Sequence, residues 1–333
     1  LGVRICSVGK IQTPKFANWF MLSLLKYDGF WYCNNKKKFY ELMIYLKLIL
    51  ATVVWGLTPS INKILSHYDS PFLITFFRFF FAAFIFFFFL KMLGKKIIVG
   101  KSNLLLFFWL GFFGFVLHNA MMVKGLEGTS AGLTSVIMSL IVVLVVLIDW
   151  VILKSIPSLQ VILGIILSIT GVYFVVFDRF SLDSNNFFDE FFIFLSALSW
   201  AIYTVMCRDA LKQHDEIVVL TYATFFAVLF LTPVPLVQSG LVAEIIVDPF
   251  PMLLLVFTGL VSSALTFFWH QQAIRKIGIV TTSVFLNLVP VFGVISASLI
   301  LKEEINIRMA IGTIITVGGI LIVTIFYRPR GQN

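Results

Sequence analysis

Two groups of polar and aromatic side chains lie inside long apolar runs, where they could contact a solute. His118 and Asn119 form the first group, and Trp269 and His270 form the second, with Gln271 beside them. If they are buried, the two histidines could titrate near neutral pH and gate a bound substrate. The alternative is that each histidine makes an ordinary hydrogen bond between helices. On the first interpretation these residues are candidates for substrate binding.

Aromatic rings and amides on other apolar runs extend this set. Trp55 and Tyr203 are large rings with one polar atom, which suit a pocket for a mostly apolar substrate, and Asn62 lies on the same run as Trp55. Packing or an interfacial belt is the alternative role for the rings. Asn287 precedes Pro290, which removes a backbone donor and frees a carbonyl. The candidate substrate-binding residues are Trp55, Asn62, His118, Asn119, Tyr203, Trp269, His270 and Asn287.

Catalytic and metal-binding patterns are absent from the sequence. The three cysteines, Cys6, Cys33 and Cys207, form no CxxC pair, and the four histidines form no HExxH pattern. There is no phosphate loop of the GxxxxGK[ST] type. We therefore predict no catalytic residues, no metal and no cofactor, and a membrane-embedded enzyme is a poor interpretation.

The amino-acid composition explains why polar candidates are so few. Of 333 residues, 60% are hydrophobic and 12% are charged, and 38 are phenylalanine. A soluble domain carries about 45–50% apolar and about 25% charged residues. The long unbroken apolar runs favour helices over the alternating strands of a membrane barrel. The composition predicts an all-α integral membrane protein and argues against a soluble enzyme, a nucleic-acid-binding protein and a disordered chain.

Ten runs are long enough for a transmembrane helix, which needs about 20 mostly apolar residues. The connections between them are short and carry turn residues such as Asp69-Ser70-Pro71, so we expect one membrane unit without a soluble domain. The ten expected helices lie at about residues 44–65, 71–91, 103–123, 129–152, 157–178, 187–210, 216–237, 250–274, 278–301 and 305–327.

Residues 1–42 differ from the rest of the chain, because they contain only a short apolar patch and a Lys36-Lys37-Lys38 run. We interpret them as an N-terminal cytoplasmic extension, either not native or disordered. Lys and Arg are concentrated in the segments on one side of the membrane, which is the cytoplasmic side by the positive-inside rule. We therefore expect a multi-pass protein of the cell inner (cytoplasmic) membrane with both termini in the cytoplasm.

The two halves of the membrane part, 43–180 and 187–327, resemble each other. Trp55 pairs with Trp200 at a spacing of 145, and Gly111 pairs with Gly259 at a spacing of 148. Each half has five expected spans, so the second half enters the membrane from the opposite side and the repeats are inverted. Inverted repeats can open in turn to each side around a midplane site, which is alternating access. Duplication for structural reasons alone is the alternative.

Two glycine pairs follow the same repeat. Gly164 and Gly171 in the first half match Gly312 and Gly319 in the second. The members of each pair are seven residues apart and therefore share one helix face. Small residues let helices approach closely, so we predict a tight helix contact at these glycines.

Short segments in both halves carry a resemblance to a known family. They are Leu50-Ala51-Thr52-Val53-Val54-Trp55-Gly56, Phe77-Arg78-Phe79, Gly125-Leu126-Glu127-Gly128-Thr129-Ser130-Ala131, Ala273-Ile274-Arg275-Lys276-Ile277-Gly278, Val289-Pro290-Val291-Phe292 and Leu301-Lys302-Glu303-Glu304. With these segments, the sequence over about residues 44–327 resembles the EamA type of the drug/metabolite transporter superfamily. It departs from that pattern at Ile141-Val142, where the family often has a proline, and at Lys154-Ser155, where it often has an acidic residue.

Arg78 is the one formal charge well inside an apolar run. It could pair with an anion in a cavity, or it could anchor neighbouring helices through their carbonyl groups. Because the resemblance includes this arginine on a peripheral helix, the structural role is favoured. No Asp or Glu lies near the centre of a run, whereas ion-driven carriers commonly bury a carboxylate there. We therefore expect a facilitator or exchanger.

The resemblance implies a transporter of small metabolites, either amino-acid-like or other small organic solutes, acting as an exporter, facilitator or exchanger. The expected partners are a small-molecule substrate and the lipid bilayer, and no nucleic acid. Nucleotide-sugar or phosphate-ester carriers of the same superfamily are the alternative, although such cargo needs several basic residues. A non-transporting membrane protein, which would lack a polar-lined cavity, is a further alternative.

Overall fold

The computed structural model of the protein describes residues 34–68, 70–94, 100–153, 157–176, 186–277, 282, 285–286 and 288–327. These residues form helices and turns, with no strand among them. Chain contacts divide the protein into two units, Leu1–Glu41 and Leu42–Asn333. Of the N-terminal extension expected at 1–42, residues 1–33 lie outside the described residues, and 34–42 are helical as the start of α2 (Asn34–Leu65).

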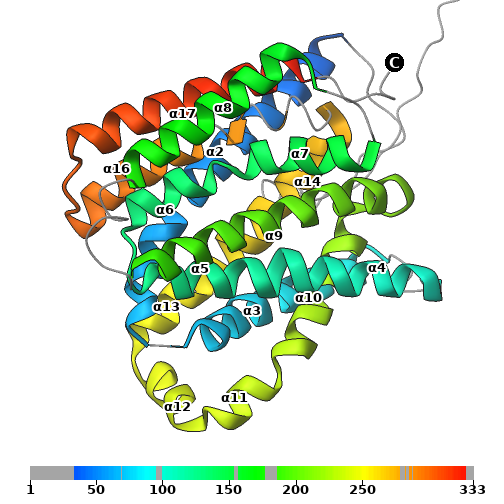
Figure 1. Ribbon diagram of the computed structural model, residues 1–333. Coiled ribbons are helices and arrows are strands. Elements are labelled where there is room, and N and C mark those ends of the chain that lie inside the picture. The colour runs from blue at the N-terminus through cyan, green and yellow to red at the C-terminus, as the bar shows by residue number, and fades with distance from the viewer. Residues whose placement is uncertain are drawn as a thin grey trace, which may run out of the picture. The chain divides into compact units, whose positions relative to one another are not determined.

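Helices of the first half begin at recognisable local signals (Figure 1). Pro71 starts α3 at a position where a missing backbone N–H costs nothing, and the Ser130 hydroxyl accepts a hydrogen bond from Leu133 N at the start of α6. The elements are α2 (Asn34–Leu65), the 3-10 turn η1 (Ser66–Tyr68), α3 (Pro71–Met92), α4 (Lys101–Gly111), the π-helical segment η2 (Phe112–Leu117), α5 (His118–Leu126), α6 (Ala131–Met138), α7 (Ile141–Leu153) and α8 (Leu159–Val176).

Helices of the second half begin in the same way. The Asp248 carboxylate accepts a hydrogen bond from Phe250 N at the start of α13, and the Asn306 side chain accepts one from Met309 N at the start of α17. The elements are α9 (Asn186–Gln213), α10 (Glu216–Leu231), α11 (Pro233–Val237), α12 (Ser239–Val247), α13 (Pro249–Phe257), the π-helical segment η4 (Thr258–Leu265), α14 (Thr266–Ile277), α16 (Val289–Leu301) and α17 (Ile307–Phe326).

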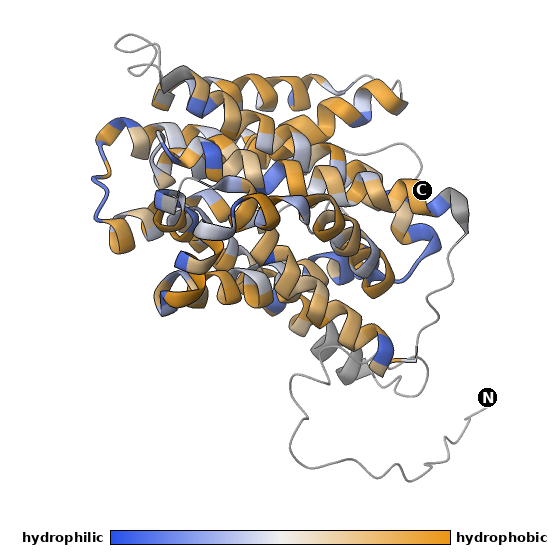
Figure 2. Ribbon diagram, turned by 90° about the horizontal axis from the view of Figure 1, so that it is seen from below, coloured by the Kyte–Doolittle hydropathy of each residue, from blue (hydrophilic) through white to orange (hydrophobic). Residues whose placement is uncertain are grey.

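Eight helical stretches of the described residues are long and apolar enough to cross a membrane. Figure 2 shows hydrophobic residues along most of the helical ribbon. The expectation of an all-α membrane protein is therefore confirmed. The count of ten stays a prediction, because two further apolar helices, Leu159–Val175 and Val289–Leu301, are shorter and 278–301 is described only in part. The eight are Leu42–Leu65, Pro71–Met92, Asn103–Leu126, Ala131–Ile152, Phe188–Gln213, Glu216–Val237, Pro249–Ile277 and Ile307–Phe326.

Several expected helices are interrupted, which hydropathy does not reveal. The run expected at 129–152 is two helices, because Ser139 N and Leu140 N bond to carbonyls three residues back and tighten the chain into a turn. The runs at 103–123 and 250–274 each contain a π-helical segment. The connection expected after residue 237 is helical as α12. These differences change the backbone inside the expected helices more than their outer bounds.

One set of helix ends is joined by polar contacts. Lys47, near the start of the α2 span, donates to Gln272 of α14 at 3.1 Å. At the end of α14, Arg275 pairs with the Asp215 carboxylate at 2.8 Å, where α9 gives way to α10. The start of α2, the ends of α9 and α14 and the start of α10 therefore lie at one end of the bundle.

A partly buried ion pair joins further helix ends to α9. Arg208, near the end of α9, pairs with Asp149 of α7 at 2.7 Å, and the Tyr327 hydroxyl at the end of α17 donates to the same carboxylate. Burial and the hydrogen bond to Asp149 raise the pKa of Tyr327, so its hydroxyl keeps the donated proton. The ends of α7, α9 and α17 therefore lie together.

Contacts at other helix ends define a second group. The Glu303 carboxylate, just after α16, accepts hydrogen bonds from Ala131 N at 2.8 Å and Gly132 N at 3.0 Å at the start of α6. Lys63, at the end of α2, donates to the carbonyl of Leu126 at the end of α5. The first set of contacts places the start of the α2 span and the end of α9 at one end of the bundle. These two helices therefore run in opposite directions.

Helices α8 and α17 lie side by side along their length (Figure 1). A Cβ added to Gly164 would lie 2.8 Å from the carbonyl oxygen of Gly319, and one added to Gly312 would lie 2.9 Å from that of Gly171. Real Cβ contacts are essentially never closer than 3.0 Å. The glycines of each helix therefore face those of the other, and the predicted tight contact is confirmed.

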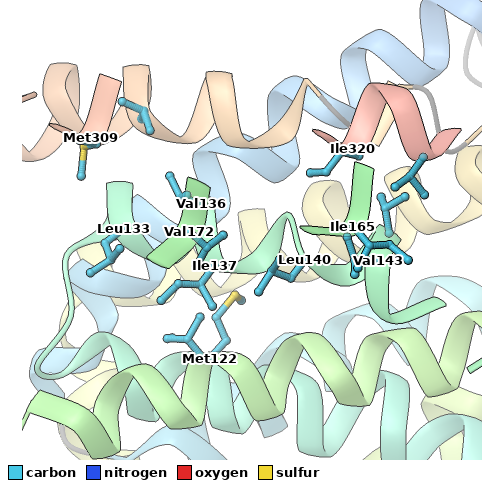
Figure 3. Close-up of a cluster of buried hydrophobic side chains, with 14 of the residues drawn as sticks. Met122, Leu133, Val136, Ile137, Leu140, Val143, Ile165, Val172, Met309 and Ile320 are labelled. Atoms are coloured by element: carbon cyan, nitrogen blue, oxygen red, sulfur yellow. The ribbon is translucent and has the colours of Figure 1, made fainter. Parts of the chain in front are cut away.

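A large apolar core lies between the same helices and α6, with side chains of α5, α7, α9 and α16 added to it. Figure 3 shows Met122 of α5 beside Ile137 of α6 and close to Val172 of α8, with Ile320 of α17 toward the other end of the cluster. All four are at most 8% exposed. Since lipid is as apolar as these side chains, the close fit of the side chains rather than release from water stabilises this core.

Candidate functional site

A cavity with about 730 Å³ of empty space lies among helices from both halves of the chain. The part of this space that a water-sized molecule can enter is about 100 Å³, and the rest includes open solvent. Its walls come from α2, α3, α5, α6 and α7 of the first half and from α9, α14 and α16 of the second. The lining residues are Trp55, Thr58, Pro59, Arg78, His118, Met122, Ser135, Met138, Ser139, Ile141, Val142, Trp200, Phe267, Leu286, Val289 and Pro290.

Aromatic rings form one wall of the cavity. The ring of Trp200 lies 4.7 Å from His118 and 5.1 Å from Phe267, measured between centroids. Trp55 meets Trp200 edge to face at 6.2 Å and Phe267 at 5.9 Å. Such ring pairs stabilise one another beyond their area burial and offer a flat apolar surface with few polar atoms.

Arg78 supplies the charge of the cavity. Its Nε donates to the Ser263 hydroxyl at 2.7 Å, and its Nη2 donates to the Ser262 hydroxyl at 3.2 Å. Its Nη1 is buried and has no hydrogen-bond partner among the described residues. The Ser262 hydroxyl also bonds to that of Thr58 at 2.7 Å. Two serines therefore hold the guanidinium in place, and one of its nitrogens remains unused.

The π-helical segment η4 makes this arrangement possible. A π segment breaks the regular hydrogen-bond pattern and exposes backbone carbonyls, often at functional sites. The carbonyl of Ser262 accepts a hydrogen bond from Trp55 Nε1 at 3.2 Å, which fixes the indole at the cavity wall. In the segment η2, the carbonyl of Phe113 likewise accepts a hydrogen bond from the Ser199 hydroxyl at 2.7 Å.

His118 is held by a serine of the second half. The Ser196 hydroxyl donates to the His118 carbonyl at 2.7 Å, and His118 Nδ1 lies 3.1 Å from the Ser196 carbonyl oxygen. A carbonyl can only accept, so we assign the imidazole proton to Nδ1. This assignment leaves Nε2 as an acceptor if the ring is neutral.

The structure brings four of the eight predicted binding residues into one cluster. Trp55 and His118 line the cavity directly. His270 contacts the Trp55 ring at 5.1 Å, and Tyr203 contacts the Trp200 ring at 4.9 Å, so both lie behind the lining. Gln271 donates to the Tyr203 hydroxyl at 2.8 Å, which holds that ring in place.

The other four predicted residues have different positions. Asn119 donates to carbonyls of η2, including that of Phe115 at 3.0 Å. Asn62 is fully buried, and neither side-chain polar atom has a hydrogen-bond partner in the described part of the chain. Trp269 is not among the lining residues. Asn287 lies outside the described residues, so its role stays a prediction.

Several residues that line the cavity are not among those predicted from the sequence. Thr58, Ser135 and Ser139 place hydroxyl groups at the cavity, and Met122 and Met138 add flexible apolar surface. Single serines and methionines in an apolar helix carry no pattern that separates cavity lining from packing. The repeat offered one usable signal, because it paired Trp200 with Trp55 and both tryptophans line the cavity.

Known proteins resemble the chain along most of its length. It is 28% identical to the uncharacterized transporter YyaM of Bacillus subtilis, over 84% of this chain and 93% of the relative. It is 26% identical to an uncharacterized transporter of Archaeoglobus fulgidus, over 84% of this chain and 96% of the relative. A WAT1-related chloroplastic protein of Arabidopsis thaliana is 25% identical over 86% of this chain and 70% of the relative.

The fold also has a counterpart among solved structures. One crystal structure aligns with 85% of this chain and 96% of its own chain, with a TM-score of 0.62 at 14% identity. The model of the EamA-like transporter family matches the sequence twice, at residues 42–177 and 188–325. The protein is therefore a member of the EamA-like transporter family.

Proposed function

We propose that the protein moves a small organic solute across the cell inner (cytoplasmic) membrane by alternating access. In this proposal ten transmembrane helices form two inverted repeats of five, and both termini lie in the cytoplasm. The cavity between the repeats is the binding site, and rocking of one repeat against the other exposes it to each side in turn.

The composition of the cavity wall is the observation that carries this proposal. Five of the contributing helices belong to the first family match and three to the second. A site shared between two repeats changes shape whenever the repeats move relative to each other. A purely structural duplication gives no reason for a cavity lined by side chains of both halves.

The directions of the first helices support the inverted arrangement. Helix α2 starts at the end of the bundle where α9 stops, as the contacts of Lys47, Arg275 and Arg208 require. An odd number of spans in each repeat produces this reversal. The concentration of Lys and Arg at one side supports cytoplasmic termini.

The chemistry of the cavity supports a small organic solute and a facilitator or exchanger mechanism. The wall combines indole and phenyl rings with hydroxyls, and Arg78 is the one formally charged group among its described residues. A nucleotide sugar carries more negative charge than one arginine can neutralise. Without a carboxylate in the described lining, there is no evident site for a coupling proton or cation.

The experiment compares solutes released and taken up by cells that carry different variants. Met138→Trp places a large ring at the cavity wall, whereas Leu163→Trp places the same ring on α8 at a side chain that is 55% exposed. We expect a defined set of small solutes to change in the medium with the wild-type protein and Leu163→Trp, and not with Met138→Trp.

The proposal fails if cells with correctly inserted wild-type protein show the same solute profile as cells without it. An unchanged profile for Met138→Trp would show that the cavity is not the transport route. Release of nucleotide sugars would replace the proposed substrate class by the phosphate-ester alternative. Insertion is checked for each variant by its amount in purified membranes.

A further inference from the structure

We infer that Arg78 is the binding site for a single anionic group, and that the cavity takes an apolar or aromatic monocarboxylate without an amino group. This inference rests on the proposed function, because it names the chemical class of the solute. It assigns to Arg78 a contact with the ligand, in addition to its bonds with Ser262 and Ser263.

The unused nitrogen of Arg78 is the first observation. The side chain is 3% exposed and faces the cavity, yet Nη1 has no partner within the described part of the chain. Its other two nitrogens bond to neutral hydroxyls, and no carboxylate pairs with the guanidinium among the described residues. A buried charge is costly unless an opposite charge compensates it. An anion bound in the cavity would remove this cost.

The second observation is that the position equivalent to Arg78 in the other repeat is an uncharged residue, Ala223. An added Cβ on Gly259 would lie 2.6 Å from the carbonyl of Arg78, and one on Gly111 would lie 2.4 Å from that of Ala223. The same helix crossing therefore occurs twice, with arginine in one copy and alanine in the other. Because an alanine suffices for the packing in one copy, the crossing itself does not require an arginine, and this supports a role for Arg78 in the cavity that it faces.

The charges and rings of the lining define the ligand. With one arginine and no Asp or Glu among the described lining residues, the cavity matches one negative charge and offers no carboxylate for an ammonium group. A guanidinium donates to a planar carboxylate in a favourable geometry. Trp55, Trp200 and Phe267 would surround the apolar body of the ligand.

Binding to the purified full-length protein tests the inference. The probes are benzoate, 3-phenylpropionate and 4-methylpentanoate, each compared with its neutral amide, and L-phenylalanine, which adds an ammonium group to 3-phenylpropionate. The readout is the shift in thermal unfolding temperature, which rises with ligand concentration when a ligand binds only the folded state. We expect at least one acid to bind about tenfold or more tightly than its amide and than L-phenylalanine.

Variants then locate the anion site. Arg78→Gln should abolish the preference for acid over amide, and Arg78→Lys should retain it with weaker binding, because lysine keeps the charge as a single point. Lys91→Gln removes a charge from the exposed end of the same helix and should change nothing. Ser139→Asp keeps Arg78 and adds a carboxylate to the cavity wall, so it should also remove the preference.

Three results would overturn the inference. The first is that no acid binds the wild-type protein better than its amide. The second is an unchanged acid preference in Arg78→Gln, or in Ser139→Asp if Arg78→Gln does not fold. The third is tighter binding of L-phenylalanine than of 3-phenylpropionate. Acid binding that depends on Arg78 in a protein without protein-dependent solute movement would instead refute transport and leave the anion site intact.

Discussion

The contact between α8 and α17 allows a sharp test, because two neighbouring glycines differ in what surrounds them. A Cβ added to Gly319 would lie 2.5 Å from Ser168 N and 2.7 Å from the carbonyl oxygen of Gly164. A Cβ added to Gly318 would meet nothing within 4 Å. The same substitution to alanine at both positions therefore separates the effect of helix packing from the effect of helix propensity.

The structure sets the size of the expected difference. Ordinary contact begins at 3.4 Å, so Gly319→Ala requires the backbone of α8 to move away by about 0.9 Å. Overpacking of this kind costs about 1–3 kcal/mol. Replacing a glycine in a helix interior by alanine gains about 0.5–1 kcal/mol, and this gain applies at Gly318 without a clash. Because the gain in helix propensity is common to both variants, Gly319→Ala should be less stable than Gly318→Ala by the overpacking cost, about 1–3 kcal/mol.

The assay is equilibrium or thermal unfolding of both variants in the same detergent, followed by circular dichroism. We expect Gly318→Ala to match or exceed the wild-type protein and Gly319→Ala to unfold earlier. Equal stability of the two variants would refute the close approach of the helices. A double variant with Gly164→Ala should cost less than the sum of the single changes, because one separation of the helices relieves both clashes.

Two further substitutions test the contacts that join helix ends. Glu303→Gln should lower the free energy of unfolding by about 0.5–2 kcal/mol, since it removes the negative charge from the first amides of α6, whereas the exposed Glu304→Gln should not. Asp149→Asn should cost about 1–3 kcal/mol by breaking the pair with Arg208, against little change for the exposed Asp209→Asn. Unfolding curves measured in one detergent check both comparisons, and equal effects within either pair would refute them.

The elements that the sequence predicts well are those that depend on hydrophobicity. The apolar runs and their Pro and Asp punctuation place the outer bounds of most helices, because a membrane span must be long and apolar. The turn at Ser139 and the π segments η2 and η4 depend on which backbone carbonyl accepts the hydrogen bond of each backbone N–H group. Apolar residue types do not encode this choice, so the interruptions could not be read from hydropathy.

The site is predictable only where the repeat or a rare residue type marks it. Trp55 and His118 stand out in apolar runs, and both line the cavity. Asn119 stands out equally, but its side-chain amide donates a hydrogen bond to a backbone carbonyl of η2. A polar residue in an apolar helix has two possible partners, a cavity or a neighbouring helix, and the sequence alone does not separate them.

The two repeats share the positions of their π-helical segments but differ in the polar side chains at the cavity. The π segments lie in equivalent helices, because their last residues, Leu117 and Leu265, are separated by the 148-residue spacing of the repeat. Each π segment also accepts a side-chain hydrogen bond from the first helix of the other repeat. Exchange between two similar states requires this kind of matched framework. The proposed substrate, a monocarboxylate with its charge at one end, sets no such requirement for matched polar side chains in the two repeats. Arg78, whose counterpart in the second repeat is Ala223, is therefore a difference between the halves that the proposed anion site explains.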